Sequence, residues 1–242
     1  MHWLSVLEKR LGCSVYRWVP LKGLTSWGTG GEAELYIAPD AIEDVIALLC
    51  LHNEYGFPLW IIGGGTNILV PDEGLPGVVL HTAKLNRVSV EECSEHTYIV
   101  ADCGVTVSRI LQVMSKEGLT GLEFMAGIPG TVGGAVKGNA GMKDGCICQA
   151  LAWVDVAQSD GRLGRKQASD FFWGYRYCSL EGLIVRAAFS LDKSERDLVQ
   201  RNIRQQIKGR TGHPKGSKTA GCVFKNPSAH SAGRLLEESG CK

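Results

Sequence analysis

The sequence predicts an α+β fold, and three observations lead to this prediction. Segments with the alternating pattern of a half-buried strand and segments with the period of an amphipathic helix occur in one chain. They do not follow one another in the regular alternation that builds a parallel sheet. The chain has 242 residues, of which 44% are hydrophobic, so it can bury a sizeable core. We therefore expect one large domain or two smaller ones.

The first unit of regular structure reads βαββ in outline. We expect a strand over residues 32–39, a helix that ends at Gly56, a short buried strand over residues 59–62 and a strand over residues 77–81. Asp40 and Glu43 are spaced as in a capping box at the start of the helix. The apolar face of this helix carries Ile42, Val45, Ile46 and Leu49.

The second unit is predicted to contain more strands. We expect strands over residues 87–91 and 97–103, a helix that Gly118 closes, a hairpin of residues 150–157 and 162–167, and a strand over residues 182–191. The helix before Gly118 has Val107, Ile110, Leu111 and Met114 on one face. A further helix begins near Ser194 and ends before Gly209, so a domain boundary is placed near Lys193.

Charge and cysteine content argue against several classes of partner. Lysine and arginine number 26 against 25 acidic residues, and a net charge of +1 provides no broad cationic field for nucleic acid or a membrane surface. No apolar run approaches the ~20 residues that a membrane span needs. The nine cysteines are irregularly spaced, and the first residues lack a signal-peptide pattern. We expect reduced thiols and a cytoplasmic protein without nucleic-acid partners or membrane insertion.

Cys146 and Cys148 form the only C-x-C pattern that suggests a metal. Without a second pair of Cys or His residues nearby, this is a weak signal for zinc. We interpret the two as ordinary thiols and expect no metal site.

Two glycine-rich segments point to a cofactor. The first, I-I-G-G-G-T-N-I-L at residues 61–69, follows a predicted strand and allows backbone N–H groups to approach a phosphate. It is not the Rossmann fingerprint, because no helix opens there, and on its own it is equally compatible with a structural turn. The second, at residues 121–141, has closely and irregularly spaced glycines that suit a backbone winding past a large diphosphate-bearing ligand.

Four further segments occur in a fixed order around these two. They are T-S-W-G-T-G-G at residues 25–31, D-E-G-L-P-G at residues 72–77, G-Y-R-Y at residues 174–177 and A-G-C-V-F-K-N-P at residues 220–227. Together with the glycine segments, they resemble UDP-N-acetylenolpyruvoylglucosamine reductase from about Leu21 to the end of the chain.

The resemblance implies a fold and a division of the chain. The fold is a two-part FAD-binding module of the vanillyl-alcohol-oxidase (PCMH) type over residues 20–193, with parts of about 20–85 and 86–193. Residues 194–242 would begin a smaller α+β substrate domain, which is expected to be incomplete. The family continues into a segment with a catalytic glutamate, and no residue here matches it, so the activity of this chain is left open.

The resemblance also implies a reaction and its cofactor. NADPH reduces noncovalent FAD, the flavin passes hydride to C3 of the enolpyruvyl group of a UDP-sugar, and C2 is then protonated to give UDP-N-acetylmuramate, a precursor of peptidoglycan. The expected FAD-binding residues are Gly63, Gly64, Gly65, Thr66, Asn67, Ile68, Gly127, Ile128, Pro129, Gly130, Gly133, Gly134, Asn139 and Gly141.

Catalytic and substrate-binding roles follow from the remaining motifs. Arg176 matches the arginine that stabilises the developing charge on the substrate carboxylate, for which a planar fork of donors is suited. Cys222 stands where the family usually has the serine that protonates C2, and a thiol can serve as that acid. Tyr175, Lys225 and Asn226 are expected to bind substrate.

Three functional classes stay open on the sequence alone. The first is the reductase, which the motifs favour. The second is a catalytically silent protein that binds flavin or a sugar nucleotide, and the third is another flavin oxidase on the same fold. An oxidase would often attach FAD through a His or Cys, and no distinctive attachment motif stands near His81 or Cys103.

Overall fold

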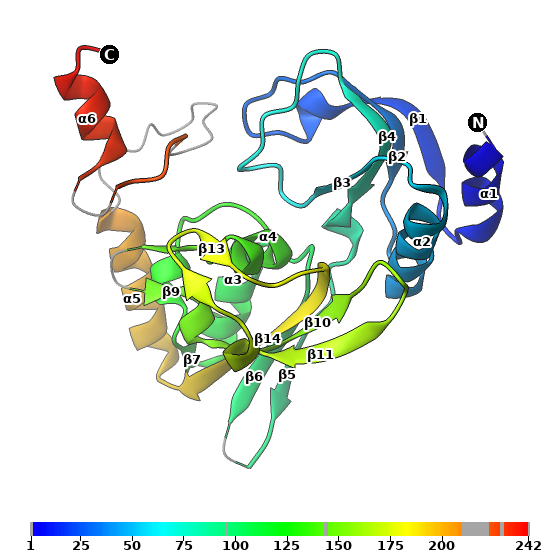
Figure 1. Cartoon of the computed structure of the whole chain (residues 1–242). Helices are drawn as coiled ribbons and strands as arrows, with labels where there is room; N and C mark the ends of the chain where they lie inside the picture. Colours follow the sequence, from blue (N-terminus) through cyan, green and yellow to red (C-terminus); the bar gives the residue numbers. More distant parts are fainter. Residues whose placement is uncertain (1, 95, 143–144, 210–222, 228–229, 242) are drawn as a thin grey trace.

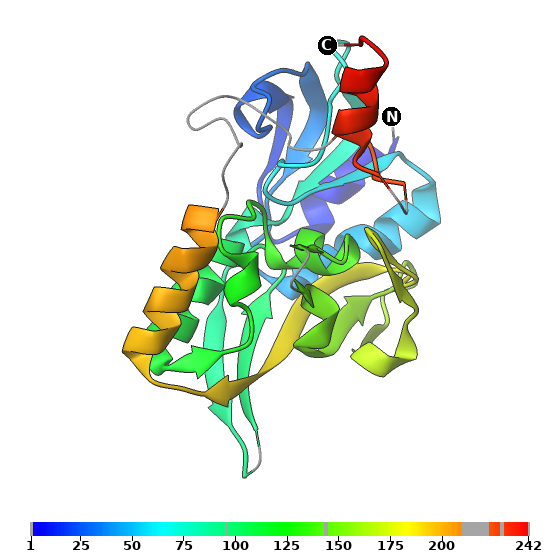
Figure 2. The same cartoon turned by 90° about the vertical axis from the view of Figure 1, so that its left-hand side faces the viewer.

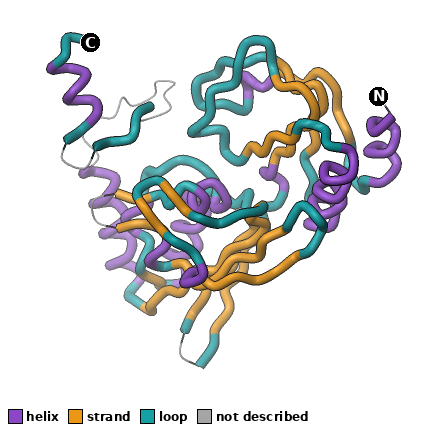
Figure 3. The backbone as a smooth tube through the Cα atoms, in the orientation of Figure 1, coloured by secondary structure: helices purple, strands orange, loops and turns teal. Residues whose placement is uncertain are grey.

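The computed structural model describes residues 2–94, 96–142, 145–209, 223–227 and 230–241. Two sheets with their helices make up most of the described chain, one in each half (Figure 1). The first half contains α1 (His2–Arg10), β1 (Val15–Pro20), β2 (Glu32–Ile37), α2 (Ile42–Tyr55), β3 (Leu59–Ile62) and β4 (Leu75–His81). The tube in Figure 3 shows the helices outside and the strands inside this half.

The first sheet has the strand order β1-β2-β4-β3. β4 runs parallel to both β2 and β3, whereas β1 is antiparallel to β2. Leu35 and Ile37 of β2 are buried in the same cluster as Leu48 of α2 and Leu7 of α1, so the two helices cover one face of the sheet. The sequence analysis did not predict β1.

Two predictions for this half need correction. α2 begins after Ala41, without a side-chain cap, so the expected capping box at Asp40 is absent; instead Asp44 in the first turn accepts a 2.7 Å hydrogen bond from the Gly12 N–H. β3 was expected to be buried, but Trp60 and Ile61 are 42% and 47% exposed. β3 is exposed because it is an edge strand that pairs only with β4.

The second half is built on an antiparallel sheet of order β11-β10-β14-β6-β5. Its elements are β5 (Val88–Glu92), β6 (Thr97–Asp102), α3 (Val107–Glu117), β7 (Leu119–Thr120), α4 (Val132–Lys137), β8 (Gly141–Met142), β9 (Gly145–Cys146), β10 (Leu151–Ala157), β11 (Leu163–Gln167), β12 (Trp173–Gly174), β13 (Tyr177–Cys178) and β14 (Leu183–Lys193). The predicted hairpin of residues 150–157 and 162–167 is confirmed as β10–β11.

A chain of charges ties the strands of this sheet together. Arg186 of β14 lies 3.2 Å from the buried carboxylate of Asp102 on β6 and 3.9 Å from Asp155 on β10. Asp155 also accepts two hydrogen bonds, of 2.9 and 3.1 Å, from Arg165 on β11. The fork geometry of arginine allows this bidentate contact, and it satisfies a carboxylate that would be costly to bury alone.

The two halves share one hydrophobic core. Val45 and Leu48 of α2 belong to the same buried cluster as Val154 and Val156 of β10 and Phe189 of β14. α4 lies on the side of the second half that faces the first sheet (Figure 1). The shared core fixes the position of the second half relative to the first sheet.

The last described helices are α5 (Arg196–Gly209) and α6 (Ala232–Glu238). α5 lies along α3 on the outside of the second half (Figure 2), and Val199 in its second turn is fully buried. The Ser194 N–H donates a 2.7 Å hydrogen bond to the carbonyl of Gly118, which closes α3 in the left-handed conformation, as predicted. The boundary near Lys193 stays a prediction. Within the described residues, no helix is both long and apolar enough to cross a membrane.

Candidate active site

The first glycine segment forms a tight turn directly after β3. Gly65 has a φ of +61°, which only glycine adopts without strain, and a Cβ there would lie 1.7 Å from the carbonyl oxygen of Leu24. The Ser26 N–H donates a 2.9 Å hydrogen bond to the Gly65 carbonyl, so the turn is fastened to the T-S-W-G-T-G-G segment. The backbone of this turn is therefore fixed in place before any ligand binds.

The two glycine segments meet across the boundary between the halves. A Cβ on Gly64 would lie 3.0 Å from the Cα of Gly130, and one on Gly63 would lie 2.4 Å from Thr131 Oγ1. A Cβ on Gly130, whose φ is +119°, would lie 3.1 Å from Thr66 Oγ1. Backbone faces backbone here because side chains larger than hydrogen do not fit.

The second segment is held by hydrogen bonds to the end of β6. The Val132 N–H donates to the Val105 carbonyl, and the Gly133 N–H donates to the Cys103 carbonyl, both at 2.8 Å. A Cβ on Gly133 would lie 2.9 Å from the Cβ of Cys103, which explains why glycine stands there. These bonds position Gly130 and Thr131 against the first segment.

Two buried polar atoms of the second glycine segment have no hydrogen-bond partner among the described residues. They are Thr131 Oγ1 and Asn139 Oδ1. Leaving a buried polar atom unpaired costs roughly 1–3 kcal/mol, so such atoms commonly await a ligand or water. Both lie on the segment that was predicted to bind a diphosphate-bearing cofactor, and a polar ligand there would satisfy them.

His81 at the end of β4 contacts both β2 and the turn formed by the first glycine segment. Its Nδ1 lies 2.6 Å from the hydroxyl of Tyr36 on β2. Burial lowers the pKa of His81, and a hydrogen bond to the backbone of Gly63 opposes this effect. The half-buried neutral ring therefore links β2 to the glycine turn. The sequence predictions did not assign this residue, and only the strand register reveals it.

The G-Y-R-Y motif is the tip of the small β12–β13 hairpin. Gly174 and Tyr177 pair across it, which places Tyr175 and Arg176 at the turn. Arg176 Nη1 donates a 3.1 Å hydrogen bond to the Gly141 carbonyl, and the guanidinium carbon lies 5.3 Å from the centre of the Tyr175 ring. Asn139 Nδ2 donates a 2.9 Å hydrogen bond to the Gly174 carbonyl. The hairpin is thus docked on the end of the second glycine segment.

Backbone strain gathers at this contact. Among the described residues other than glycine, positive φ values occur at Trp18, Asn139 and Arg176. Two of these three were predicted as site residues from the sequence. Left-handed conformations of such residues cost on the order of 1–3 kcal/mol each and persist only where the surroundings enforce them.

The remaining predicted residues are not brought to Arg176. Cys222 lies outside the described residues. Lys225 is exposed, and Asn226 Oδ1 accepts a 3.0 Å hydrogen bond from the Ala232 N–H at the start of α6. Within the described part of the chain, neither side chain makes a hydrogen bond or an ion pair with Arg176. Their substrate-binding roles stay predictions.

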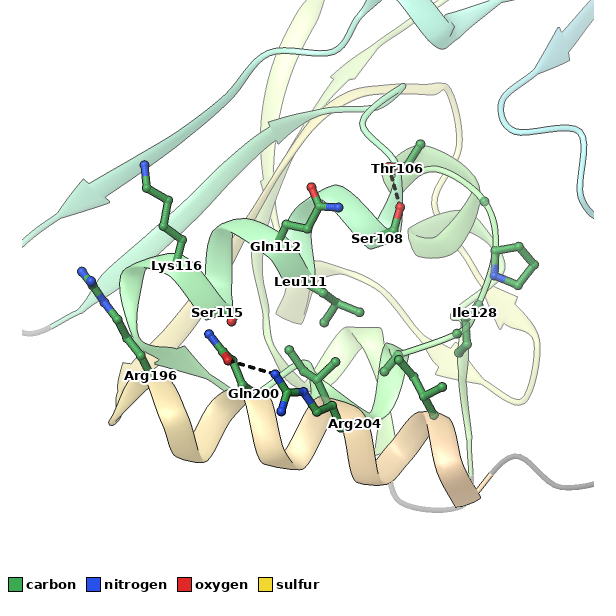
Figure 4. A pocket seen from close by; sticks show the side chains of 16 residues that line it. Thr106, Ser108, Leu111, Gln112, Ser115, Lys116, Ile128, Arg196, Gln200 and Arg204 are labelled. Carbon is green, nitrogen blue, oxygen red and sulfur yellow. Dashed lines mark hydrogen bonds between the residues drawn. The ribbon is translucent and has the colours of Figure 1, made fainter.

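A groove of about 970 Å³ borders the second glycine segment (Figure 4). Gly127, Ile128, Pro129 and Gly130 form one wall, and α3 and α5 form the others. Lys116, Arg196 and Arg204 place positive charge along the helices, and Leu111 lies between them. Neither residues 63–65 nor Arg176 lines this groove, so we do not place the reaction there. In the sequence, only the apolar faces of these two helices indicate that a groove could form here.

Comparison with known proteins identifies the family. The FAD binding domain family matches residues 33–165. UDP-N-acetylenolpyruvoylglucosamine reductase of Moorella thermoacetica is 38% identical over 226 residues, which cover 92% of this chain and 74% of that protein. The chain belongs to the UDP-N-acetylenolpyruvoylglucosamine reductase family. The enzyme of the same name from Geobacter metallireducens is 35% identical over 239 residues, covering 98% of this chain and 78% of its own length.

Solved structures agree with this assignment. A crystal structure of UDP-N-acetylenolpyruvylglucosamine reductase from Thermus caldophilus has a TM-score of 0.82 and 32% identity, and the match covers 95% of this chain and 81% of that one. A VAO-type flavoprotein from Myceliophthora thermophila C1 has a TM-score of 0.64 at 14% identity, covering 79% and 47%, and shows the fold alone. The predicted α+β fold with an FAD-binding module of the vanillyl-alcohol-oxidase type is confirmed, as is the prediction of a flavin-dependent oxidoreductase with FAD as cofactor.

Proposed function

We propose that this member of the reductase family converts UDP-N-acetylglucosamine enolpyruvate to UDP-N-acetylmuramate for peptidoglycan synthesis, with NADPH as hydride donor. The observation that carries the proposal is the docking of the Arg176 hairpin onto Gly141, at the end of the glycine segment that meets residues 63–65. The glycine backbone that we propose to bind the cofactor and the guanidinium that we propose to bind the substrate are therefore linked through Gly141. The relatives from Moorella thermoacetica and Geobacter metallireducens are UDP-N-acetylenolpyruvoylglucosamine reductases, which supports the reduction of this substrate.

The residues at the junction fit an FAD diphosphate. The close approach of Gly64 to Gly130 leaves bare backbone on both sides. Thr131 Oγ1 at the junction and Asn139 Oδ1 further along the same segment lack partners among the described residues. We propose that FAD is held noncovalently by the fourteen residues predicted from the two segments, from Gly63 to Gly141. When bound, FAD supplies the transfer of hydride from NADPH to C3 of the enolpyruvyl group.

Arg176 is proposed to stabilise the charge that develops on the substrate carboxylate. One of its N–H groups is occupied by the Gly141 carbonyl, which fixes the direction of the guanidinium. The remaining N–H donors of the guanidinium are suited to a carboxylate, and the guanidinium stays protonated throughout. A donor fixed in advance lowers the barrier more than one that must reorganise during the reaction.

Proton delivery and substrate binding complete the proposal. C2 must receive a proton after hydride has reached C3, and Cys222 is the proposed acid. Tyr175 lies beside Arg176 and is proposed to contact the substrate, together with Lys225 and Asn226. We also propose that residues 194–242 begin the substrate-binding domain and that residues 20–193 form the FAD module in two parts.

A flavin reconstitution experiment tests the proposal against a silent binding protein. The purified chain should release FAD on denaturation, and the apoprotein should regain one FAD per chain. With FAD bound, NADPH and UDP-N-acetylglucosamine enolpyruvate together should yield UDP-N-acetylmuramate, and NADH should do so less efficiently. FAD binding without any product would favour a silent flavin-binding protein, and failure to bind FAD would remove the cofactor assignment.

A further inference from the structure

The C-x-C pattern, which the sequence suggested to be two ordinary thiols, is a close pair in the structure. Cys146 Sγ lies 3.1 Å from Cys148 Sγ, and both residues are partly exposed. Cys146 ends β9, and Cys148 lies in the short 3-10 turn that follows, Ile147–Gln149. No other two cysteines of the described chain have their sulfur atoms in such contact.

The surroundings of the pair give the two sulfurs different chemistry. Burial, assisted by a hydrogen bond to Cys146, raises the pKa of the Cys148 thiol to about 11. Cys148 therefore keeps its proton at neutral pH, and its sulfur lies within hydrogen-bond distance of the Cys146 sulfur. Because the thiolate is the form of cysteine that attacks an oxidant, the first attack is assigned to Cys146 and not to Cys148. Partial exposure gives a small oxidant access to it.

We propose that Cys146 and Cys148 form an oxidisable dithiol, in which Cys146 reacts with hydrogen peroxide and Cys148 closes an intramolecular disulfide. The Cys146 thiolate attacks one peroxide oxygen, the O–O bond breaks, and hydroxide leaves to become water by taking a proton. Cys148 then attacks the resulting sulfenic acid, loses its proton, and expels a second water as the S–S bond forms. Two thiols are oxidised by two electrons, and one peroxide is reduced to two waters.

The geometry permits closure without unfolding. A disulfide needs the sulfurs about 2.05 Å apart, so they must approach by about 1 Å from their present positions. Rotation of the two side chains on either side of Ile147 supplies such a movement, although a disulfide that closes so short a loop is strained and correspondingly easy to reduce. The bond is therefore expected to be reversible.

Oxidation would reach the parts of the site that hold Arg176. Cys146 pairs with Gly141 across the β8–β9 ladder, and the Gly141 carbonyl accepts the hydrogen bond from Arg176. The side chain of Asn139 interacts with the Cys148 thiol. This consequence rests on the proposed function. Closing the disulfide should slow reduction of the enolpyruvyl substrate by roughly tenfold or more, because small displacements of a catalytic group have effects of this size.

Peptide mapping of the FAD-loaded full chain tests the dithiol. Trypsin releases residues 144–162, which contain Cys146 and Cys148 and no other cysteine. After limited peroxide treatment and alkylation, this peptide should have lost two hydrogens and carry no alkyl group, and dithiothreitol should restore both thiols. The peptide with Cys178 is the internal control and should stay reduced, because Cys178 is buried. Alkylation of both Cys146 and Cys148 after treatment would overturn the proposal.

Single variants separate the two roles. Cys148→Ser should stop at a sulfenic acid on Cys146 that dimedone traps, whereas Cys146→Ser should leave Cys148 unreacted. The reverse pattern would contradict the assignment, and Cys50→Ser controls for the general loss of a thiol. If no disulfide forms after peroxide treatment and the chain still reduces the UDP-sugar, only the dithiol inference is contradicted. If the disulfide forms but the chain never reduces the UDP-sugar, the proposed function is contradicted and the dithiol inference stands.

Discussion

Gly65 is the most tightly packed position in the first glycine turn. In Gly65→Ala, the new Cβ would meet the Leu24 carbonyl at 1.7 Å, so we expect a loss of roughly 2–4 kcal/mol in the free energy of unfolding and a marked loss of FAD affinity. Gly56→Ala is the matched control, because Gly56 has a similar φ of +67° with nothing within 4 Å of its Cβ position. It should cost about 1 kcal/mol. Equal losses by urea denaturation would contradict the steric account.

His81 predicts a pH dependence of stability. Its pKa is lowered in the folded state, so between the folded and unfolded pKa values the unfolded chain binds more protons. Stability should therefore fall as the pH drops from 7 through about 6.5, and level off once both states are protonated. His81→Gln should flatten this part of the curve, measured by urea denaturation at several pH values. An unchanged slope in the variant would remove the role given to the ring.

Arg176 predicts a separation of the two half-reactions. Arg176→Lys keeps the charge but loses the fork, so hydride transfer to the enolpyruvyl substrate should slow by roughly a hundredfold while NADPH still bleaches the flavin at the parental rate. Rapid-mixing absorbance measurements of each half-reaction check this. Similar damage to both half-reactions would mean that Arg176 positions the flavin instead.

Among the elements, α5 provides the test of how the C-terminal part attaches to the module. Val199 is fully buried against the second half, whereas its neighbour Leu198 is 43% exposed. Val199→Ala should cost roughly 1–3 kcal/mol through the cavity it leaves, and Leu198→Ala less than about 1 kcal/mol. Protection of α5 amides in hydrogen exchange should fall in the first variant alone. Equal effects would mean that α5 does not depend on this contact.

Local signals explain which elements the sequence predicted well. Gly56 and Gly118 end α2 and α3 in the left-handed conformation. Such caps can be predicted from the sequence because glycine adopts this conformation without strain. The exposure of β3 could not be predicted, because an apolar run does not show whether its strand lies at the edge of a sheet. β1 was missed; Trp18 in its middle has a φ of +53° and does not pair with β2, and the burial pattern of the strand does not alternate.

At the scale of the whole molecule, the site depends on contacts that no local pattern specifies. The glycine segments were recognisable individually, but the approach of Gly64 to Gly130 joins residues 66 positions apart. The bond between Arg176 and the Gly141 carbonyl and the support of Gly63 by His81 arise in the same way, from strand register and the docking of a hairpin. Motif resemblance named most of these residues, and only the fold shows what holds them.

Anaerobic rapid mixing of the FAD-loaded full chain tests the central claim most directly. NADPH should bleach the flavin, and subsequent addition of UDP-N-acetylglucosamine enolpyruvate should restore the oxidised flavin spectrum without oxygen, with one UDP-N-acetylmuramate formed per flavin. A reduced flavin that is reoxidised by oxygen but not by this substrate would contradict the claim that the Arg176 site and the glycine cradle together form a UDP-N-acetylenolpyruvoylglucosamine reductase.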